Sequence, residues 1–279
     1  MIVDFHTHIF PPRFIEQREA LLKAEPHLAE IYSSPKARMA TAEEVAASME
    51  QDGVGSSVVL GANWASAERC REANDYLLES AARYPGRLIA FCGLPPGGSE
   101  AAVREIERCA GGGARGVGEL RPDVLGIELG DEAAMAPLVE AMERHRLMLL
   151  MHTSEPVGHT YPGKAHLTPE VVYPFLLRFP GLTVVCAHWG GGLPFYALMP
   201  EVARALENTY FDTAASPFLY RPQIYSQAIQ IVGEGKVLFG SDFPLMPQGR
   251  PIAEIRSLCL PQQVEGLVLG GNAARLLGL

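Results

Sequence analysis

Eight short apolar segments recur along the chain and constrain its fold more than any other sequence feature. They are rich in Val, Ile, Leu and Phe, and successive segments begin 54, 32, 26, 33, 36, 26 and 27 residues apart. Most of these intervals have room for one helix and two short loops, which is the repeating unit of a parallel α/β sheet. The predicted strands cover residues 2–8, 56–62, 88–94, 114–121, 147–153, 183–189, 209–215 and 236–242.

Helical patterns occupy the intervals between these strands. Thr41-Ala42-Glu43-Glu44 is a capping box and Gly53 is a helix-stop signal, so we expect a helix between them. Helical spacing also covers residues 66–84, 99–110, 131–146 and 168–179.

The number of βα units predicts an α/β fold, specifically a (β/α)8 TIM barrel that forms a single domain over residues 1–279. Such barrels typically have about 250 residues. A doubly wound open sheet is the alternative, but that fold usually carries a Gly-rich phosphate-binding turn after its first strand. This chain continues His-Thr-His-Ile-Phe-Pro-Pro at that point, so we favour the barrel.

The first interval is the longest, and residues 11–40 within it are predicted to form an insertion after the first strand. The segment contains Pro-Pro, a short helical stretch over residues 14–24 and Ser33-Ser34-Pro35. An insertion at this point would lie over the top of the barrel, where loops shape active sites. The alternative is a surface elaboration without function.

Six polar side chains lie at or near the carboxyl ends of the apolar strands. In a parallel barrel these ends meet around one rim, so the six side chains are expected to converge. A single His or Asp at a strand end is more often structural, but six together indicate a functional site. Two of them are two residues apart on the first strand and therefore share a face. The set is His6, His8, Glu119, His152, His188 and Asp242.

Four imidazoles and two carboxylates suit one or two divalent cations, with zinc as the first choice and manganese or iron as alternatives. Such an ion lowers the pKa of a bound water to about 7. The other histidines are not assigned to this site. His27 and His145 are expected at the surface, while His159 and His166 lie in a loop, where they either reach the substrate or face solvent.

Charge and cysteine content exclude several classes of function. The chain has 23 Lys and Arg against 32 Asp and Glu, a formal net charge of −9, which is unsuited to a nucleic-acid backbone. No apolar run approaches the roughly 20 residues of a membrane span, and the start Met-Ile-Val-Asp-Phe-His does not resemble a signal peptide. Five cysteines without a Cys-x-x-Cys pair predict neither a disulfide framework nor a thiolate zinc site. We expect a soluble cytoplasmic protein that binds neither nucleic acid nor membranes.

Five motifs distributed over the whole chain carry a family resemblance. They are Asp4-Phe5-His6-Thr7-His8, His152 after the fifth strand, Ala187-His188-Trp189-Gly190-Gly191, Phe239-Gly240-Ser241-Asp242-Phe243-Pro244 and Gly270-Gly271-Asn272-Ala273-Ala274-Arg275-Leu276-Leu277. Together they resemble the amidohydrolase superfamily, and more narrowly its amidohydrolase-related branch. That branch contains aminocarboxymuconate-semialdehyde decarboxylase and the resorcylate decarboxylases.

The resemblance implies roles for five of the residues at the strand ends. It implies that His6, His8, His152 and Asp242 bind a metal, usually zinc. His188 is then a catalytic residue that orients or polarises water or substrate. Asp242 is also a catalytic residue, acting as general base and proton shuttle. The branch further implies a small-molecule substrate and a homodimer.

Glu119 leaves the number of ions open. Binuclear members of the superfamily place a bridging carboxylate near this point, and no lysine lies at the end of the third or fourth strand to be carboxylated. As a bridge, Glu119 would join an ion held by the first-strand histidines and Asp242 to a second ion on His152 and His188. The alternative is that Glu119 pairs with Arg121 or contacts the substrate.

The favoured function is a metal-dependent hydrolase, in which metal-activated water attacks a small-molecule ester, lactone or amide. The alternative is a metal-dependent, non-oxidative decarboxylase (a carboxy-lyase) of an aromatic or dienoic acid. Arg121 or Arg250 would then hold a substrate carboxylate, and Trp189 would stack on an aromatic ring. A barrel that has lost its activity and serves as a binding module is a third hypothesis.

Overall fold

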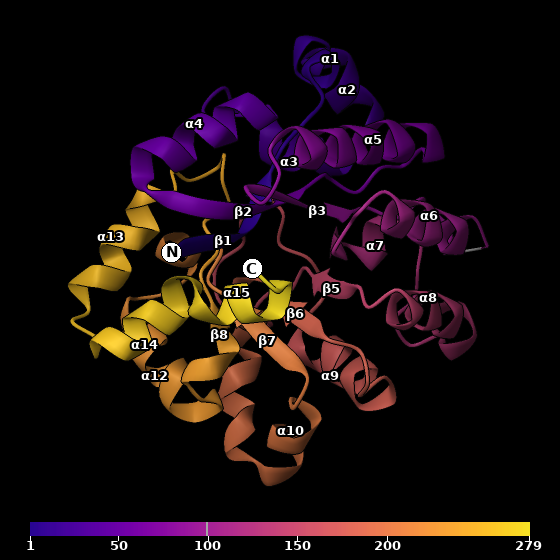
Figure 1. The fold of residues 1–279 in the computed structure, drawn as a ribbon. Helices are drawn as coiled ribbons and strands as arrows, with labels where there is room; N and C mark the ends of the chain where they lie inside the picture. The colour runs from indigo at the N-terminus through magenta and orange to yellow at the C-terminus, as the bar shows by residue number, and fades with distance from the viewer. Residues whose placement is uncertain (99) are drawn as a thin grey trace.

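The eight predicted strands all form, and they pair in chain order in one parallel sheet. The computed structural model describes residues 1–98 and 100–279, and over these residues the sheet curves into a barrel surrounded by helices (Figure 1). Hydrogen bonds close the barrel between its first and last strands, from the amide of Phe5 to the carbonyl of Phe239 (2.7 Å) and from Asp242 to His6 (2.9 Å). The strands are β1 Ile2–His8, β2 Val54–Leu60, β3 Leu88–Cys92, β4 Gly116–Leu120, β5 Met148–Met151, β6 Val184–Cys186, β7 Thr209–Asp212 and β8 Val237–Leu238. The prediction of a (β/α)8 barrel is confirmed.

The helices begin close to where their sequence signals predict. Thr41 caps α4 through a complete capping box, and Gly53 ends that helix in the left-handed conformation. The predicted start of one helix at Ser99 lies outside the described residues. The α-helices are α1 Pro12–Glu16, α2 Arg18–Ala24, α3 Pro26–Tyr32, α4 Ala42–Asp52, α5 Ala67–Arg83, α6 Glu100–Gly111, α7 Pro122–Leu125, α8 Glu132–Arg144, α9 Pro169–Arg178, α10 Pro200–Ala205, α11 Ser216–Leu219, α12 Gln223–Val232, α13 Gly249–Ser257, α14 Gln262–Gly266 and α15 Asn272–Leu277. Turns tighter than an α-helix form η1 His188–Leu198 and η2 Glu234–Lys236, and a wider π-type turn forms η3 Leu267–Gly271.

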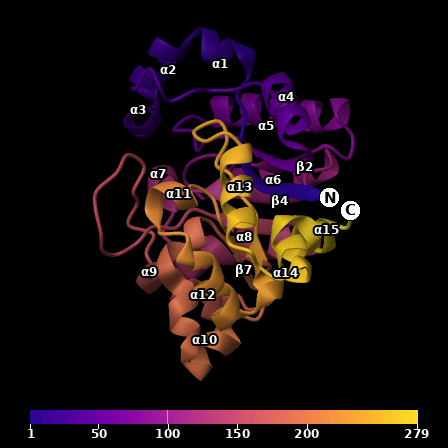
Figure 2. The same ribbon diagram turned by 90° about the vertical axis from the view of Figure 1, so that its left-hand side faces the viewer.

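The core is divided between the inside of the barrel and the layer between strands and helices. Alternate residues of the strands fill the barrel, among them Val3 and Phe5 of β1 and Met148 and Leu150 of β5. Helix α15 packs on this interior cluster through Ala273 and Leu277. Figure 2 shows α15 and both chain termini at one end of the barrel, with α3, α7, α11 and the loop between β5 and α9 at the other. The second end is therefore the one at which the carboxyl ends of the strands lie.

Among the register shifts between paired strands, two are β-bulges that insert an extra residue next to predicted site residues. Between β1 and β2, Asp4 pairs with Ser57 but Thr7 pairs with Val59, so β1 has one extra residue. Between β4 and β5, residues 117 and 120 pair with residues 149 and 151, which gives β4 one extra residue as well. A bulge of this kind reverses which side chains point into the barrel beyond it.

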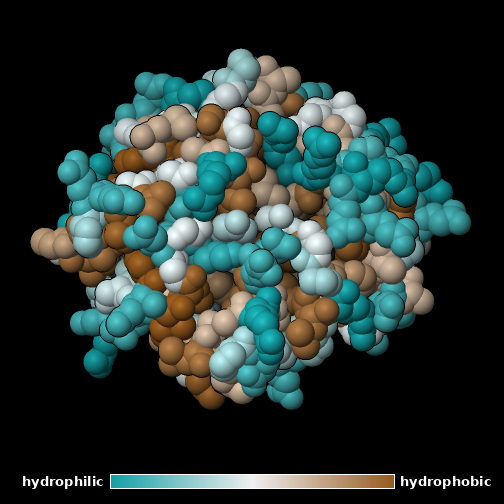
Figure 3. All heavy atoms as spheres, turned by 60° about the horizontal axis from the view of Figure 1, so that its bottom comes forward, coloured by the Kyte–Doolittle hydropathy of each residue, from teal (hydrophilic) through white to brown (hydrophobic). Residues whose placement is uncertain are grey.

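The outer surface mixes apolar and hydrophilic side chains. Figure 3 views the molecule with the lower side of Figure 1 turned forward, and on this face hydrophilic residues separate the apolar ones. Leu198 is the most exposed large apolar residue of η1, at 74%. No helix in the described part of the chain has the length and apolar character needed to cross a membrane.

Candidate metal centre

The six predicted site residues converge at the carboxyl ends of the strands, and three different backbone features turn them inward. His152 continues the inward alternation of Met148 and Leu150. The bulge in β4 turns Glu119 to the interior, and the bulge in β1 does the same for the two histidines of that strand. His188 has a left-handed backbone, with φ of 53°, as does Asp242, with φ of 68°. Non-glycine residues with such angles are uncommon and concentrate at functional sites.

Each of the four histidines is held by one ring nitrogen, which leaves the other nitrogen facing the centre of the cluster. Nδ1 of His6 lies 2.9 Å from Oδ2 of Asp212. Nδ1 of His8 donates to the carbonyl of Gly61 (2.9 Å), and Nδ1 of His188 donates to a backbone carbonyl of residue 214 (3.1 Å). His152 is held the other way round, with Nε2 3.1 Å from Oγ of Ser154. Carbonyl and carboxylate oxygens accept only, so the Nδ1 atoms beside them carry the proton and the opposite Nε2 atoms are free to bind a cation.

The two carboxylate oxygens of Glu119 face two different pairs of histidines. Oε2 lies 3.6 Å from Nε2 of His6 and 3.7 Å from Nε2 of His8. Oε1 lies 2.8 Å from Nδ1 of His152 and 3.2 Å from Nε2 of His188. These atoms form two groups of potential metal ligands, each group within 4.8 Å and both including Glu119.

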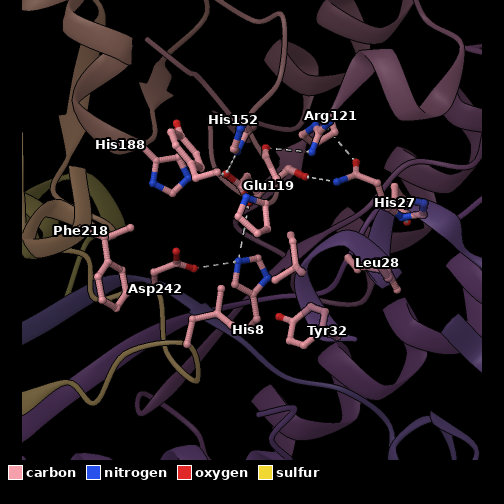
Figure 4. A pocket seen from close by; sticks show the side chains of 18 of the residues that line it. His8, His27, Leu28, Tyr32, Glu119, Arg121, His152, His188, Phe218 and Asp242 are labelled. Atoms are coloured by element: carbon pink, nitrogen blue, oxygen red, sulfur yellow. Dashed lines mark hydrogen bonds and ion pairs between the residues drawn. The ribbon is translucent and has the colours of Figure 1, made fainter. Parts of the chain in front are cut away.

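Asp242 joins the first of these groups. Its Oδ1 lies 3.6 Å from Nε2 of His8 and 3.9 Å from Nε2 of His6. Figure 4 shows the Asp242 carboxylate directed at His8, with Glu119 between the histidines. All six predicted side chains are thus brought together.

The chemistry of this donor set fits a divalent cation. Bonds of about 2.0–2.2 Å to nitrogen and oxygen place neighbouring ligand atoms roughly 3–3.5 Å apart. The Nε2 atoms of His6 and His8 are 3.1 Å apart. When both are unprotonated their lone pairs oppose each other, so a cation between them is favourable. The sequence-based expectation of a divalent metal site agrees with this arrangement.

The electrostatics of the cluster favour an anionic Glu119 beside the imidazoles. Burial alone would raise the pKa of Glu119, but His152 and His6 hold it well below its ordinary value. Burial disfavours a charge on His188, yet its hydrogen bond to Glu119 raises its pKa to about 9. Burial, reinforced by the neighbouring His6, lowers the pKa of His8. A cation at the cluster competes with the protons on these rings.

Asp212 is a site residue that sequence reasoning missed. It is fully buried at the end of β7, and besides holding His6 it accepts the backbone N–H of His188 (3.0 Å) through Oδ1. Partners of this kind orient metal ligands. The signal that identified the other residues, a polar side chain ending an apolar strand, is also present here in Thr209-Tyr210-Phe211-Asp212.

A cavity of about 300 Å³ opens onto the cluster (Figure 4). Its walls combine apolar side chains with a few polar ones, and they come from the segment after β1 and from the loops after β2, β4, β5, β7 and β8. Besides the cluster residues, the lining includes Phe10, Leu28, Ile31, Tyr32, Phe218, Leu219 and Leu245, together with His27, Asn63, Arg121, His159 and Tyr161. Four of these, His27, Leu28, Ile31 and Tyr32, belong to α3 within residues 11–40.

The structure places the two predicted substrate-binding residues differently. Arg121 lines the cavity, and its binding of substrate stays a prediction. Trp189 is not among the described residues lining it: its side chain is fully buried, donates from Nε1 to Oγ of Ser216 (2.9 Å) and packs edge-on against Tyr225. The left-handed backbone at Trp189 turns the indole into the layer between strands and helices, so this tryptophan cannot stack on a ligand in the cavity. Arg250, also considered as a carboxylate partner, is not among the described residues lining the cavity; its guanidinium lies over the ring of Phe218, 5.1 Å from the ring centroid.

The histidines outside the cluster also differ in part from expectation. His27, expected at the surface, is half-buried and donates from Nε2 to the carbonyl of Asn63 (2.5 Å). His145 and His166 are exposed, and the exposed His159 lines the cavity mouth. Asn63 was also missed; its side chain donates to the carbonyl of Glu119 (2.9 Å) and accepts from the amide of Arg121 (3.0 Å), which fixes the segment carrying Glu119.

Gly118 is required at the bulge that aims Glu119, which gives a prediction for Gly118→Ala. Its φ is +144°, and an added Cβ would lie 2.3 Å from the carbonyl oxygen of Leu150. We expect a loss of about 3 kcal/mol of unfolding free energy, because both the backbone angle and the contact must be relieved. Thermal unfolding should show a Tm lower by roughly 6–12 °C. Gly130→Ala is the matched control, since nothing lies near its added Cβ; equal Tm values for the two variants would contradict the prediction.

Comparison with known proteins adds the family context. A family model described as amidohydrolase matches residues 3–279. The gamma-resorcylate decarboxylase of Polaromonas sp. is 24% identical over 63% of this chain, and the matched part spans 66% of that relative, just under two thirds. The 6-methylsalicylic acid decarboxylase of Penicillium expansum is 25% identical over 98% of this chain and 95% of its own length.

Solved structures share the fold. The 5-carboxyvanillate decarboxylase of Sphingomonas paucimobilis superimposes with a TM-score of 0.79 at 20% identity, covering 100% of this chain and 99% of that one. The dihydroxybenzoic acid decarboxylase of Polaromonas sp. JS666, which contains manganese and the inhibitor 2-nitroresorcinol, gives a TM-score of 0.74 at 18% identity, covering 100% and 97%.

These comparisons overturn one expectation. The favoured function, a hydrolase of an ester, lactone or amide, is wrong, because the curated relatives are named as decarboxylases. The reason for the error is chemical: the same histidines and carboxylates serve a metal ion in either reaction, so the motifs that contain them do not distinguish hydrolysis from decarboxylation.

Proposed function

This chain belongs to the amidohydrolase family, and within that family we propose that it is a metal-dependent decarboxylase of an aromatic or dienoic acid. The observation that carries the proposal is the cavity itself, which has the His and carboxylate cluster at its base and aromatic and aliphatic side chains along its walls. Flat apolar walls suit a conjugated ring or diene, and the cluster suits the acidic end. The decarboxylase names of the curated relatives support the same reaction.

We assign the metal to the two ligand groups that share Glu119. The first consists of His6, His8, Asp242 and Oε2 of Glu119, and the second of His152, His188 and Oε1 of Glu119. When bound, the ion supplies positive charge that holds an anionic oxygen of the substrate and withdraws electrons from the bond to be broken. Zinc suits the imidazole ligands, while the dihydroxybenzoic acid decarboxylase contains manganese; elemental analysis distinguishes the two.

The chain's own residues carry out the proton transfer in this proposal. The bond between the carboxyl carbon and the substrate skeleton breaks, and its electron pair remains on the skeleton carbon. Asp242, whose carboxyl reaches the cavity beside His8, donates a proton to that carbon as CO₂ leaves and then regains a proton from solvent. The apolar walls formed by Leu28, Phe218 and Leu245 limit the access of water to the carbanionic carbon.

The direct test is release of CO₂ from a panel of 2-hydroxybenzoic and dienoic acids by metal-loaded protein. We expect turnover of at least one acid, its loss after treatment with a chelator and its return when the ion is restored. No CO₂ from any acid, with the metal present at full occupancy, would contradict the proposal. The homodimer also remains a prediction, which sedimentation tests.

Tyr32 provides a prediction about substrate contact. Burial and then the carboxylates of Asp242 and Glu119 raise the pKa of its hydroxyl, which therefore stays protonated. Among the described residues the hydroxyl has no hydrogen-bond partner, and it lines the cavity (Figure 4). We propose that it donates to a substrate oxygen. Tyr32→Phe should lower kcat/KM by about 10–100-fold, the value of one hydrogen bond to a charged group.

The control for this variant is Tyr225→Phe, which removes a hydroxyl buried against Trp189 in the layer between strands and helices. Steady-state kinetics and metal content should be measured for both proteins. Tyr32→Phe should keep its metal and Tyr225→Phe should keep its activity. Unchanged kcat/KM in Tyr32→Phe would show that the hydroxyl does not contact the substrate.

A further inference from the structure

The cavity has one permanent positive charge, and that charge is already neutralised within the protein. Arg121 is the one Lys or Arg among the described residues that line the cavity. Resting on the proposed function, we propose that the site accepts acids with a single carboxylate, the one that is lost, and discriminates against acids with a second. A second carboxylate would need a guanidinium that Asp123 already occupies.

Arg121 and Asp123 form a bidentate ion pair, which is the strongest arrangement for a guanidinium and a carboxylate. Nε of the arginine donates to Oδ1 of the aspartate at 3.0 Å, and Nη2 donates to Oδ2 at 2.6 Å, so the pairing is bidentate. The third nitrogen, Nη1, donates to the carbonyl of Gly163 in the loop after β5 (3.3 Å). Each of the three guanidinium nitrogens of Arg121 therefore already donates a hydrogen bond within the protein.

The surrounding backbone holds both partners of the pair. The amide of Arg121 donates to Oδ1 of Asn63 (3.0 Å). Pro122 begins α7 immediately afterwards and places Asp123 in the first turn, two residues from its partner. The arginine side chain is only 13% exposed. Swinging the guanidinium onto a ligand would break two charge-assisted hydrogen bonds and leave the Asp123 carboxylate unpaired, which is costly.

The other charges near the cavity do not replace this cation. Glu119 and Asp242 bring negative charge to the same space. The ammonium of Lys164 is bound to the carbonyls of Val157 (2.9 Å) and His159 (3.1 Å), and Arg250 lies over the ring of Phe218. The proposed metal ion already holds the substrate's reacting end, so a second carboxylate would lose its hydration without gaining another cation.

Two unreactive probes, benzoate and isophthalate (benzene-1,3-dicarboxylate), test the discrimination against a second carboxylate, because they differ by one carboxylate. Calorimetric titration of the metal-loaded protein should give isophthalate a Kd about tenfold weaker than that of benzoate. In Asp123→Asn, which frees the guanidinium, this ratio should fall by about tenfold. Asp131→Asn makes the same charge change at an exposed helix cap and should leave the ratio unchanged.

Equal or tighter binding of isophthalate by the wild-type protein would overturn the inference, as would an unchanged ratio in Asp123→Asn. If Asp123→Asn fails to fold, the double variant Arg121→Gln with Asp123→Asn, which removes both charges together, decides: the ratio stays within about twofold if the guanidinium is occupied, but rises about tenfold if it binds the second carboxylate. The readout is binding and needs no turnover. Absence of CO₂ release from every acid would contradict the proposed function, whereas the ratio of Kd values tests only the charge selection.

Discussion

Glu119→Ala is expected to remove one of two metal ions per chain and to lower decarboxylation by about 10³-fold. The structure directs Oε2 of Glu119 at the two histidines of β1 and Oε1 at His152 and His188, so its loss separates the two ligand groups. Removal of a charged group that organises a transition state typically costs 10²–10³-fold. Elemental analysis of protein purified without chelator, alongside CO₂ release, measures both effects.

Two further variants make the Glu119 result specific. Glu119→Gln retains the shape but removes the charge, and it should also lose an ion. Glu140→Ala removes a carboxylate from the exposed face of α8 and should bind metal and turn over substrate like the wild type. One ion per chain in the wild type, unchanged in Glu119→Ala, would contradict the bridge and would make Glu119 a substrate contact.

Asp242→Asn is expected to lower kcat by about 10²–10⁴-fold with little change in substrate binding. An amide oxygen can still face the cation, but the side chain no longer has a carboxylic proton to give to carbon. Single-turnover measurements of CO₂ release should show the loss, while calorimetry should show that the substrate still binds. Because Asp242 also lies among the proposed metal ligands, metal content must be measured on the same samples.

The conservative variant separates the two roles of Asp242. Asp242→Glu keeps a carboxylic acid on a longer side chain and should recover part of kcat relative to Asp242→Asn. If metal content falls in parallel with kcat in both variants, Asp242 acts as a ligand alone and another group delivers the proton.

The fold was predictable because its signal repeats. Eight apolar runs separated by helical intervals define the barrel, and Thr41 and Gly53 mark the ends of α4 as expected. Polar residues that end apolar strands likewise locate the site, because a parallel barrel brings those ends together. The same rule identifies Asp212 in retrospect, since it ends β7 in the same way.

Other features depend on tertiary context that short sequence patterns do not contain. The orientation of Trp189 follows from the left-handed turn after β6, and the sequence next to His188 does not show which way the indole faces. Tyr32 reaches the cavity because α3 folds back over the barrel, and its sequence neighbours resemble those of any surface helix. The hydrolase prediction was wrong because the same histidines and carboxylates suit hydrolysis and decarboxylation alike.

The two bulges separate the residues of the candidate site from the hydrophobic barrel core that supports them. Ahead of them, Val3 and Phe5 of β1 fill the barrel interior in ordinary alternation; beyond the extra residue, the histidines take over that inward direction. Deleting one residue in β1 would return the strand to regular pairing and turn the histidines away from the axis. Insertion or deletion of a single codon in β1 can therefore create or abolish the candidate metal centre, while most of the hydrophobic core keeps its packing.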